Sequence, residues 1–186
     1  MTIQKPIETP RLLLKCMTPA IIWEAFSAQS KEEIMTAFGI DEEDFAVLKQ
    51  RHDGGMETSS ISFCYFLLIE KASNRSIGEC GFHTLNRKHR RADAFYSLKN
   101  DSDKRKGLMS EAFGEVLKFG FTELGLHRVA ALLAKENTAS LKLLQKYHFT
   151  REGTMREDYV VDGKNEDSEC YSLLRWEWEK TNRFSF

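Results

Sequence analysis

Residues 92–125 read ADAFYSLKNDSDKRKGLMSEAFGEVLKFGFTELG, and this stretch decides the fold. Its first seven residues predict a β-strand. From Leu108 the apolar residues recur at a period near 3.6, which predicts a helix with one buried face, and Gly125 ends that helix. The residues between the two segments include Lys104, Arg105, Lys106 and Gly107, which we call the basic turn. The stretch therefore predicts a strand–turn–helix unit.

The basic turn has the chemistry of an anion site. The first N–H groups of a helix have no partner within it, and the helix dipole adds partial positive charge at the same place. Gly107 lets a ligand come close to the backbone because it has no Cβ. The side chains of Lys104, Arg105 and Lys106 add full positive charges. An ordinary basic surface turn has the same sequence features, so the segment alone does not decide between the two interpretations.

Outward from this unit, the pattern predicts one α/β domain over residues 1–186. Thr18, Asp41 and Asn137 stand where they can cap helices, and the turn Asp162-Gly163 separates the last two strands. The predicted strands are residues 11–17, 62–70, 76–85, 92–98, 128–134, 149–161 and 169–177. The predicted helices follow Thr18 and Asp41 and cover residues 31–38, 108–124 and 138–147. The order is an antiparallel meander, then strand–helix–strand–helix, then a closing hairpin.

Composition excludes several classes of function. The 186 residues carry 27 Lys and Arg against 28 Asp and Glu, whereas a non-specific nucleic-acid binder needs a basic face. No segment has the length and hydrophobicity of a membrane span or a signal peptide. The four cysteines are scattered and form no Cys-x-x-Cys pair, which favours reduced thiols in the cytoplasm. His83 and His89 have no third ligand at a suitable spacing, so no metal site is expected.

Several phrases, taken in order, resemble the GNAT superfamily of N-acetyltransferases. The resemblance is greatest to the branch that includes the ribosomal-protein N-terminal acetyltransferases. The matching phrases are TPRLLL (9–14), ADAFYSL (92–98), KGLMSEA (106–112), FTELGLHRV (121–129), NTASLKLL (137–144), REG (151–153) and DGK (162–164). Their order covers nearly the whole chain, and residues 35–60 match least. The resemblance implies a mixed, mostly antiparallel central sheet with splayed fourth and fifth strands, flanked by helices.

The resemblance also implies acetyl-CoA as the co-substrate. Its pyrophosphate would lie on the N–H groups of residues 105–109, and its pantetheine arm would run between residues 95–98 and 130–133. Asn137 matches a position that contacts this arm, and it can cap the following helix at the same time. The residues expected to bind acetyl-CoA are Tyr96, Ser97, Leu98, Arg105, Lys106, Gly107, Leu108, Met109, Asn137 and Ser140.

The chain departs from the family pattern at four positions. Arg105 stands where a second glycine is usual, which costs roughly 1 kcal/mol or more if the residue needs a positive φ. Phe95 and His148 also replace glycines. Leu144 stands where related enzymes often have an acidic tyrosine, and Tyr147 is too far along the helix to replace it simply.

Acetyl transfer to an amine needs a base for the amine and a proton donor for the leaving thiolate. Asp93 on the fourth strand and Glu79 between two nearby glycines are the candidate bases. Each could equally be an ordinary charged residue on the solvent-exposed side of a strand. Ser140 matches a position that sometimes serves as the acid, and an ordinary polar residue of a first helical turn would look the same.

We therefore expect transfer of an acetyl group from acetyl-CoA to a primary amine by direct attack in a ternary complex. The amine would be a protein N-terminus or a small molecule, with no role for nucleic acid or membrane. The alternative is a non-catalytic acyl-CoA-binding or regulatory domain of the same fold. Homodimers are frequent in the branch that the chain resembles, but no dimer interface can be read from the sequence.

Overall fold

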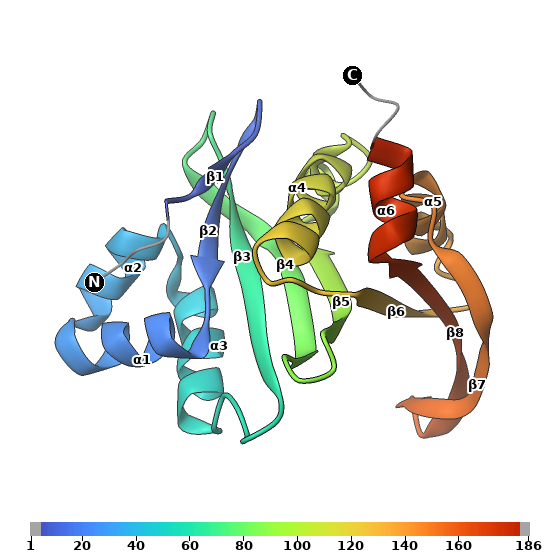
Figure 1. Ribbon diagram of the computed structural model, residues 1–186. Coiled ribbons are helices and arrows are strands. Elements are labelled where there is room, and N and C mark those ends of the chain that lie inside the picture. The colour runs from blue at the N-terminus through green and yellow to red at the C-terminus, as the bar shows by residue number, and fades with distance from the viewer. Residues whose placement is uncertain (1–4, 183–186) are drawn as a thin grey trace.

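The computed structural model describes residues 5–182, and it consists of an eight-stranded sheet with helices on both faces (Figure 1). The strands are β1 (Ile7–Glu8), β2 (Leu12–Met17), β3 (Ser62–Glu70), β4 (Arg75–Asn86), β5 (Arg91–Leu98), β6 (Arg128–Ala134), β7 (Thr150–Val161) and β8 (Lys164–Leu174). The helices are α1 (Pro19–Ala28), α2 (Lys31–Phe38), α3 (Glu42–Asp53), α4 (Leu108–Thr122), α5 (Thr138–Lys146) and α6 (Arg175–Asn182), with a short 3₁₀ turn at Asp101–Asp103.

The sheet order is β1-β2-β3-β4-β5-β6-β8-β7, and every neighbouring pair is antiparallel except β5 and β6. These two strands are parallel and pair through residues 91–93 and 128–130. In the described chain their ladder stops there, so residues 94–98 of β5 and 131–134 of β6 separate. This arrangement confirms the predicted mixed sheet with two splayed strands; the short β1 makes them the fifth and sixth in our numbering.

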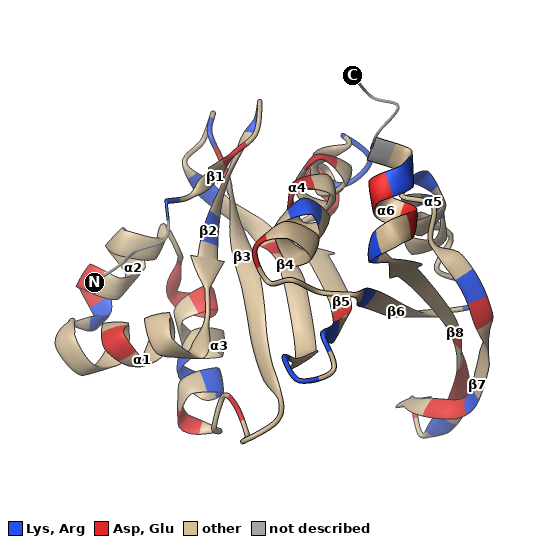
Figure 2. Ribbon diagram, viewed as in Figure 1, with Lys and Arg blue, Asp and Glu red and all other residues tan. Residues whose placement is uncertain are grey.

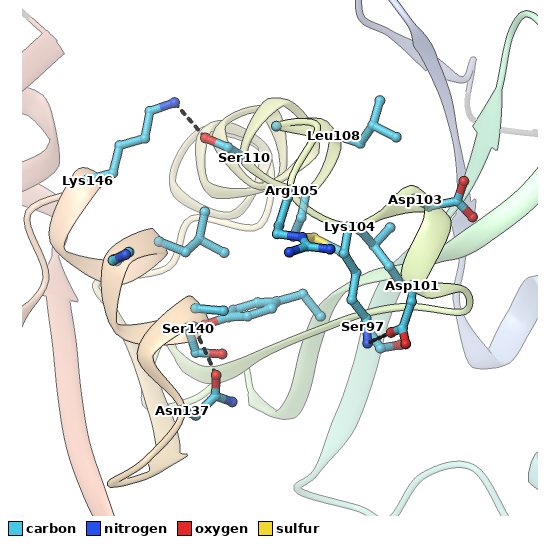
Figure 3. A pocket seen from close by; sticks show the side chains of 17 residues that line it. Ser97, Asp101, Asp103, Lys104, Arg105, Leu108, Ser110, Asn137, Ser140 and Lys146 are labelled. Carbon is cyan, nitrogen blue, oxygen red and sulfur yellow. Dashed lines mark hydrogen bonds and ion pairs between the residues drawn. The ribbon is translucent and has the colours of Figure 1, made fainter.

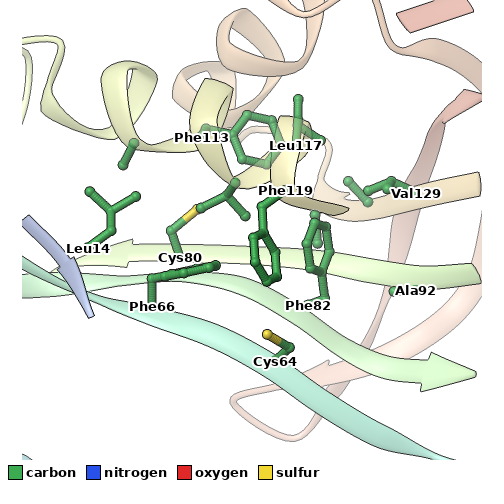
Figure 4. Packing of buried hydrophobic residues seen from close by; sticks show 14 of the residues in the cluster. Leu14, Cys64, Phe66, Cys80, Phe82, Ala92, Phe113, Leu117, Phe119 and Val129 are labelled. Carbon is green, nitrogen blue, oxygen red and sulfur yellow. The ribbon is translucent and has the colours of Figure 1, made fainter. Parts of the chain in front are cut away.

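Helix α4 covers one face of the sheet, because its apolar stripe is buried there. Phe113, Val116 and Leu117 have no exposed surface, and they pack with Phe66 and Phe82 of the central strands (Figure 4). Gly120 is required at this contact, since a Cβ there would lie 2.5 Å from the Phe82 ring. These contacts belong to the largest apolar cluster of the described residues. They hold α4, and with it the basic turn at its start, in a fixed position on the sheet.

Helices α1, α2 and α3 cover the opposite face of the sheet beside β2 and β3 (Figure 1). The second apolar cluster lies there, with Ile22, Ile34 and Leu48 from the helices against Tyr65 and Leu67 of β3. Strand β3 is thus buried on both faces, which accounts for its run of aromatic and aliphatic residues.

The predicted helix caps are confirmed. The side chain of Thr18 accepts a hydrogen bond from the N–H of Ile21, Asp41 accepts from Asp44, and Asn137 accepts from Ser140.

Two element predictions were wrong or incomplete. The strand predicted at residues 169–177 instead covers Lys164–Leu174, and residues 175–177 begin α6. The Glu177 carboxylate accepts from the N–H of Leu174 at 2.8 Å, an N-terminal capping contact, and Trp178 stacks on Phe121. Strand β1 was not predicted, because its two residues are held only by pairing with β2.

Candidate active site

A cavity of about 960 Å³ lies between the start of α4, helix α5 and the end of β5 (Figure 3). We call it the larger cavity. Nine of the ten residues predicted to bind the co-substrate line it: Tyr96, Ser97, Leu98, Arg105, Gly107, Leu108, Met109, Asn137 and Ser140. Lys106 is exposed and is not part of the lining. Lys142 and Lys146 of α5 also line the cavity, and the sequence analysis did not single them out. The cavity therefore has cationic side chains on two of its walls.

Two residues of the basic turn that line this cavity have unusual backbone conformations. Arg105 and Gly107 both have left-handed backbones, with φ of 61° and 77°. Left-handed residues within a turn aim successive N–H groups to one side, which makes an anion-binding concavity. The first backbone hydrogen bond of α4 runs from Glu111 N to Gly107 O at 3.0 Å, so the N–H groups of residues 108–110 precede the helical ladder.

Arg11 holds the basic turn from the side of β2. Its Nη1 donates to the Lys106 carbonyl at 2.9 Å, and its Nε donates to Glu111 Oε2 at 2.7 Å. The C=O and N–H of one trans peptide point in opposite directions. Fixing the Lys106 carbonyl on Arg11 therefore turns the Gly107 N–H away from Arg11, and Gly107 lines the larger cavity.

The carboxylate of Glu111 completes this brace. It accepts from the Thr9 hydroxyl at 2.5 Å and from the Arg11 backbone N–H at 2.8 Å. Burial raises the pKa of Glu111, but the hydrogen bonds from Thr9 and Arg11 outweigh it, so the net pKa lies below its usual value. Glu111 is therefore held as an anion.

A second ion pair braces the chain before the turn. Arg75 Nη2 donates to Asp103 Oδ1 at 2.9 Å, and the Asp103 side chain is 3% exposed. This hydrogen bond is the main cause that keeps the pKa of Asp103 below its usual value. Although Asp103 lines the larger cavity, its charge is balanced by Arg75.

Tyr96 and Ser140 meet inside the larger cavity. Burial raises the pKa of the half-buried Tyr96, and a hydrogen bond with the Ser140 side chain opposes that rise in part. Asn137 Oδ1 accepts from the Ser140 N–H at 3.0 Å and holds the start of α5 (Figure 3). A phenol that keeps its proton therefore lies beside Ser140, a pairing that the sequence analysis did not foresee.

The neighbouring residues of α5 have structural contacts. Leu144 is fully buried, and Tyr147 donates its hydroxyl proton to the Ser110 carbonyl at 2.5 Å. Tyr147 thus ties α5 to α4 rather than facing the lining of the larger cavity.

Glu79 and Asp93 lie away from the larger cavity lining, on β4 and β5. Both oxygens of Glu79 accept from the Arg51 guanidinium, each at 2.9 Å. Asp93 is half-buried and accepts a hydrogen bond from the Thr84 hydroxyl. Glu79 lies directly opposite Ser97 in the sheet, and Ser97 lines the larger cavity. The structure thus places the two predicted bases near β5 without bringing either to Ser140.

The glycine beside Glu79 permits this arrangement. Gly78 has a φ of 155°, and a Cβ there would lie 2.1 Å from the Ser97 carbonyl oxygen. Glu79 therefore lies where β4 comes unusually close to β5.

Three further observations bear on the chemistry. Among residues 5–182, no group of three or more His, Cys, Asp or Glu side chains could hold a metal ion. No helix of the described chain has the length and hydrophobicity to cross a membrane. Acidic and basic residues are interspersed over the elements instead of gathering by sign (Figure 2).

The chain matches proteins of known family. Residues 11–150 match the family model described as acetyltransferase (GNAT) domain. YoaA of Bacillus subtilis, an uncharacterized N-acetyltransferase, is 30% identical over 91% of this chain and 96% of its own length.

Two solved structures share the fold. The spermidine/spermine N-acetyltransferase SpeG of Vibrio cholerae has a TM-score of 0.69 at 18% identity, over 94% of this chain and 99% of that one. The ribosomal-protein-S5-alanine acetyltransferase of Vibrio fischeri has a TM-score of 0.66 at 19% identity, over 93% of this chain and 98% of that one. With the family match and the splayed sheet, these findings show that the chain belongs to the GNAT family of N-acetyltransferases.

Proposed function

We propose that the protein transfers an acetyl group from acetyl-CoA to a primary amine, either a protein N-terminus or a small molecule, in the cytoplasm. The observation that carries this proposal is the larger cavity, which is lined by the basic turn and by residues 96–98 of β5, where that strand has separated from β6. The four free cysteines agree with a reducing compartment.

The residues present fit acetyl-CoA. The N–H groups of residues 105–109 would hold the pyrophosphate, and Lys142 and Lys146 would add positive charge from α5. The pantetheine arm would lie between residues 94–98 and 131–134, where strand backbone has no partner across the gap. Asn137 would contact this arm while it caps α5.

The chemical step is attack of the neutral amine nitrogen on the thioester carbonyl, after which the C–S bond breaks. A carboxylate takes the amine proton, and Asp93 suits this better than Glu79, since both Glu79 oxygens are engaged by Arg51. Ser140, which lines the larger cavity together with Tyr96, returns a proton to the leaving thiolate. A thiol has a pKa of about 8.5, so a weak acid is sufficient.

The first test is thermal melting with acetyl-CoA and with desulfo-CoA. At a ligand concentration of about 100 Kd we expect roughly 2.7 kcal/mol of stabilisation. Thiol release over a panel of amines and N-terminal peptides then tests transfer. No stabilisation by either ligand at millimolar concentration would remove the proposal.

A second candidate is a non-catalytic acyl-CoA-binding domain. The burial of Leu144, where related enzymes often have an acidic tyrosine, favours it. Stabilisation by acetyl-CoA without thiol release for any amine would select this candidate over the enzyme.

A further inference from the structure

A second cavity lies on the face of β4 and β5 that α3 covers. Its volume is about 280 Å³, and we call it the aromatic cavity. The six residues that line it are Arg51, Phe63, Tyr65, Glu79, His83 and Phe95. Four of them carry rings in continuous contact: the centroids of Phe63 and Tyr65 are 5.6 Å apart, those of Tyr65 and Phe95 5.9 Å, and those of Phe95 and His83 5.6 Å.

This cavity adjoins the gap between β5 and β6 through the strand itself. Phe95 precedes Tyr96 in β5, and Tyr96 lines the larger cavity. Glu79 is opposite Ser97, which also lines the larger cavity. Successive side chains of a strand point to opposite faces, so Phe95 and Tyr96 enter the aromatic cavity and the larger cavity from opposite faces of β5. An acyl group held in the gap would therefore lie beside the strand that carries residues of both cavities.

Arg51 already occupies the place that a bound ammonium would take. Its Cζ lies 4.8 Å from the centroid of the Tyr65 ring, which is a cation–π contact. The same guanidinium engages both oxygens of Glu79, the one carboxylate among the six lining residues. The ion pair is 32% and 24% exposed in its two side chains. The Arg51 guanidinium thus already serves as the cation that the Tyr65 ring and the Glu79 carboxylate would otherwise offer to bind.

Burial and hydrogen bonding keep these groups in their present charge states. Burial raises the pKa of Tyr65 to about 12, so its phenol stays neutral. Burial alone would lower the pKa of Arg51, but the bond to Glu79 reverses this and the net pKa is raised. What remains open to a ligand is therefore mainly the faces and edges of Phe63, Phe95 and His83.

We propose, on the basis of the acetyl transfer proposed above, that the aromatic cavity selects a primary amine next to an aromatic or branched aliphatic group. A cavity of about 150 Å³ holds one benzene molecule, so this cavity accommodates a ring and a short linker. A polyamine carries several ammonium groups, and burying them in this cavity would need several free carboxylates. The acceptor is therefore not a polyamine, although SpeG shares the fold.

The test compares catalytic efficiencies in the full-length protein. One arm uses 2-phenylethylamine, isoamylamine and spermidine; the other uses peptides that begin with Phe, Leu or Ser. We expect kcat/KM for the aromatic or branched member to exceed that for spermidine or the Ser peptide at least tenfold. The arm with the larger kcat/KM identifies a free amine or a protein N-terminus as the source. Equal or higher kcat/KM for spermidine would overturn the inference.

A substitution tests the role of Arg51 in this selectivity. Arg51→Met keeps the length of the side chain and releases Glu79, so kcat/KM for spermidine relative to 2-phenylethylamine should rise at least tenfold. Lys49→Met removes an exposed cation from the same helix and should leave this ratio unchanged. An unchanged ratio in a folded Arg51→Met protein would contradict the role of Arg51. If that variant does not fold, the selectivity of the natural protein decides.

Failure of the inference is distinguishable from failure of the proposed function. If no amine is acetylated, melting of the CoA-saturated protein with each amine still measures selectivity. Stabilisation by 2-phenylethylamine but not by spermidine supports the aromatic cavity even then. Equal stabilisation by both, or by neither, would overturn it.

Discussion

His148 and Arg105 have left-handed backbones although each carries a side chain, with φ of 59° and 61°. Both stand where glycine is usual in the family that the sequence resembles. His148 follows α5 in a Schellman arrangement: its N–H donates to the Gln145 carbonyl, and the Phe149 N–H donates to the Leu144 carbonyl, each at 3.0 Å. The hydrogen bonds of the turn are thus kept, and the cost is the steric strain of a Cβ.

We predict that His148→Gly stabilises the protein. His148 is exposed, so the substitution removes strain without opening the core. The free energy of unfolding should rise by about 1 kcal/mol, and Tm should rise by roughly 2–4 °C. His148→Ala is the control, because alanine keeps the Cβ and should stay within about 0.5 kcal/mol of the natural protein. Equal melting temperatures for the glycine and alanine variants would contradict this account.

The hydroxyl of Tyr96 can be removed while its ring is kept. The ring packs edge-on against Phe113, with centroids 5.1 Å apart, and phenylalanine preserves that contact. Because the Tyr96 phenol would resupply the proton that Ser140 gives to the thiolate, we predict that Tyr96→Phe lowers kcat by about 10²-fold, the lower end of the range for general acids. The dissociation constant of acetyl-CoA should change less than about twofold, since the hydroxyl would act through Ser140 on the leaving thiolate and not on binding.

The pH profile checks the same assignment. Burial raises the pKa of Tyr96 above its usual value of 10.0, so the phenol stays mostly protonated well into the alkaline range. We therefore expect little loss of kcat from ionisation of Tyr96 between about pH 7 and 9. A fall in the natural protein within this window that is absent from Tyr96→Phe would contradict the assignment.

At the scale of elements, Arg11 connects β2 to the basic turn through the Lys106 carbonyl and Glu111. We predict that Arg11→Gln raises KM for acetyl-CoA roughly tenfold, the equivalent of one lost hydrogen bond to a charged group. The catalytic efficiency with S-acetylpantetheine should change less than about twofold, because that donor lacks the pyrophosphate.

The choice of donor separates positioning of the turn from general destabilisation. A merely unstable protein would lose activity with both donors alike. Lys71→Gln is the matched control, since Lys71 pairs with Glu8 at the same edge of the sheet and touches no residue of the turn. Equal losses with acetyl-CoA and S-acetylpantetheine in Arg11→Gln would rule out the positioning role.

The Glu111 brace should also make stability depend on pH. The folded-state pKa of Glu111 is depressed, so its contribution is present above the usual value of 4.5 and is lost as pH falls through the folded pKa. We predict that Glu111→Gln lowers the free energy of unfolding by about 1.5–3 kcal/mol at pH 7. The difference from the natural protein should shrink steadily below pH 4.5 in urea unfolding. A constant difference from pH 7 to pH 3 would exclude the linkage.

The elements that could be predicted from sequence are those whose signal is local. The stripe of α4 and the caps at Thr18, Asp41 and Asn137 are such signals, and each is present. Helix α6 was not predicted, because the alternation around Trp176 resembles a strand. The available signal was a glutamate, Glu177, at the third position of the helix, from which its carboxylate accepts from the N–H of Leu174.

The same distinction between local and long-range features applies to the candidate site. The basic turn and Asn137 could be predicted because each lies at the start of a helix that the sequence pattern indicates. The bond between Arg51 and Glu79 joins positions 28 residues apart, and that between Arg11 and Glu111 joins positions 100 apart. No periodicity or turn chemistry specifies such pairs, since they arise only when α3 and β2 pack on the sheet.

At the scale of the whole molecule, the described sheet consists of two parts that share a short parallel ladder. One part is β1–β5 and the other is β6–β8, and residues 91–93 pair with 128–130 between them. Helix α4 packs across this junction, with Phe113 and Val116 in one cluster with Val129 of β6 and Ala92 of β5. Beyond the ladder, residues 96–98 of β5 therefore line the larger cavity, on the side of the strand where β6 no longer pairs with it.

We predict that acetyl-CoA slows amide hydrogen exchange in residues 94–98 and 131–134, because N–H groups without a ladder partner gain one from the pantetheine arm. Adenosine 3′-phosphate 5′-diphosphate keeps the pyrophosphate and lacks that arm, so it should protect residues 104–110 and leave the two strand segments unchanged. The β7–β8 turn at residues 161–164 lies outside the cavity lining and should exchange alike with and without ligand. Mass spectrometry of peptides over these segments measures all three. If both ligands protected the strand segments equally, the arm would not lie in the gap, and the splay would serve the packing of α4 rather than the co-substrate.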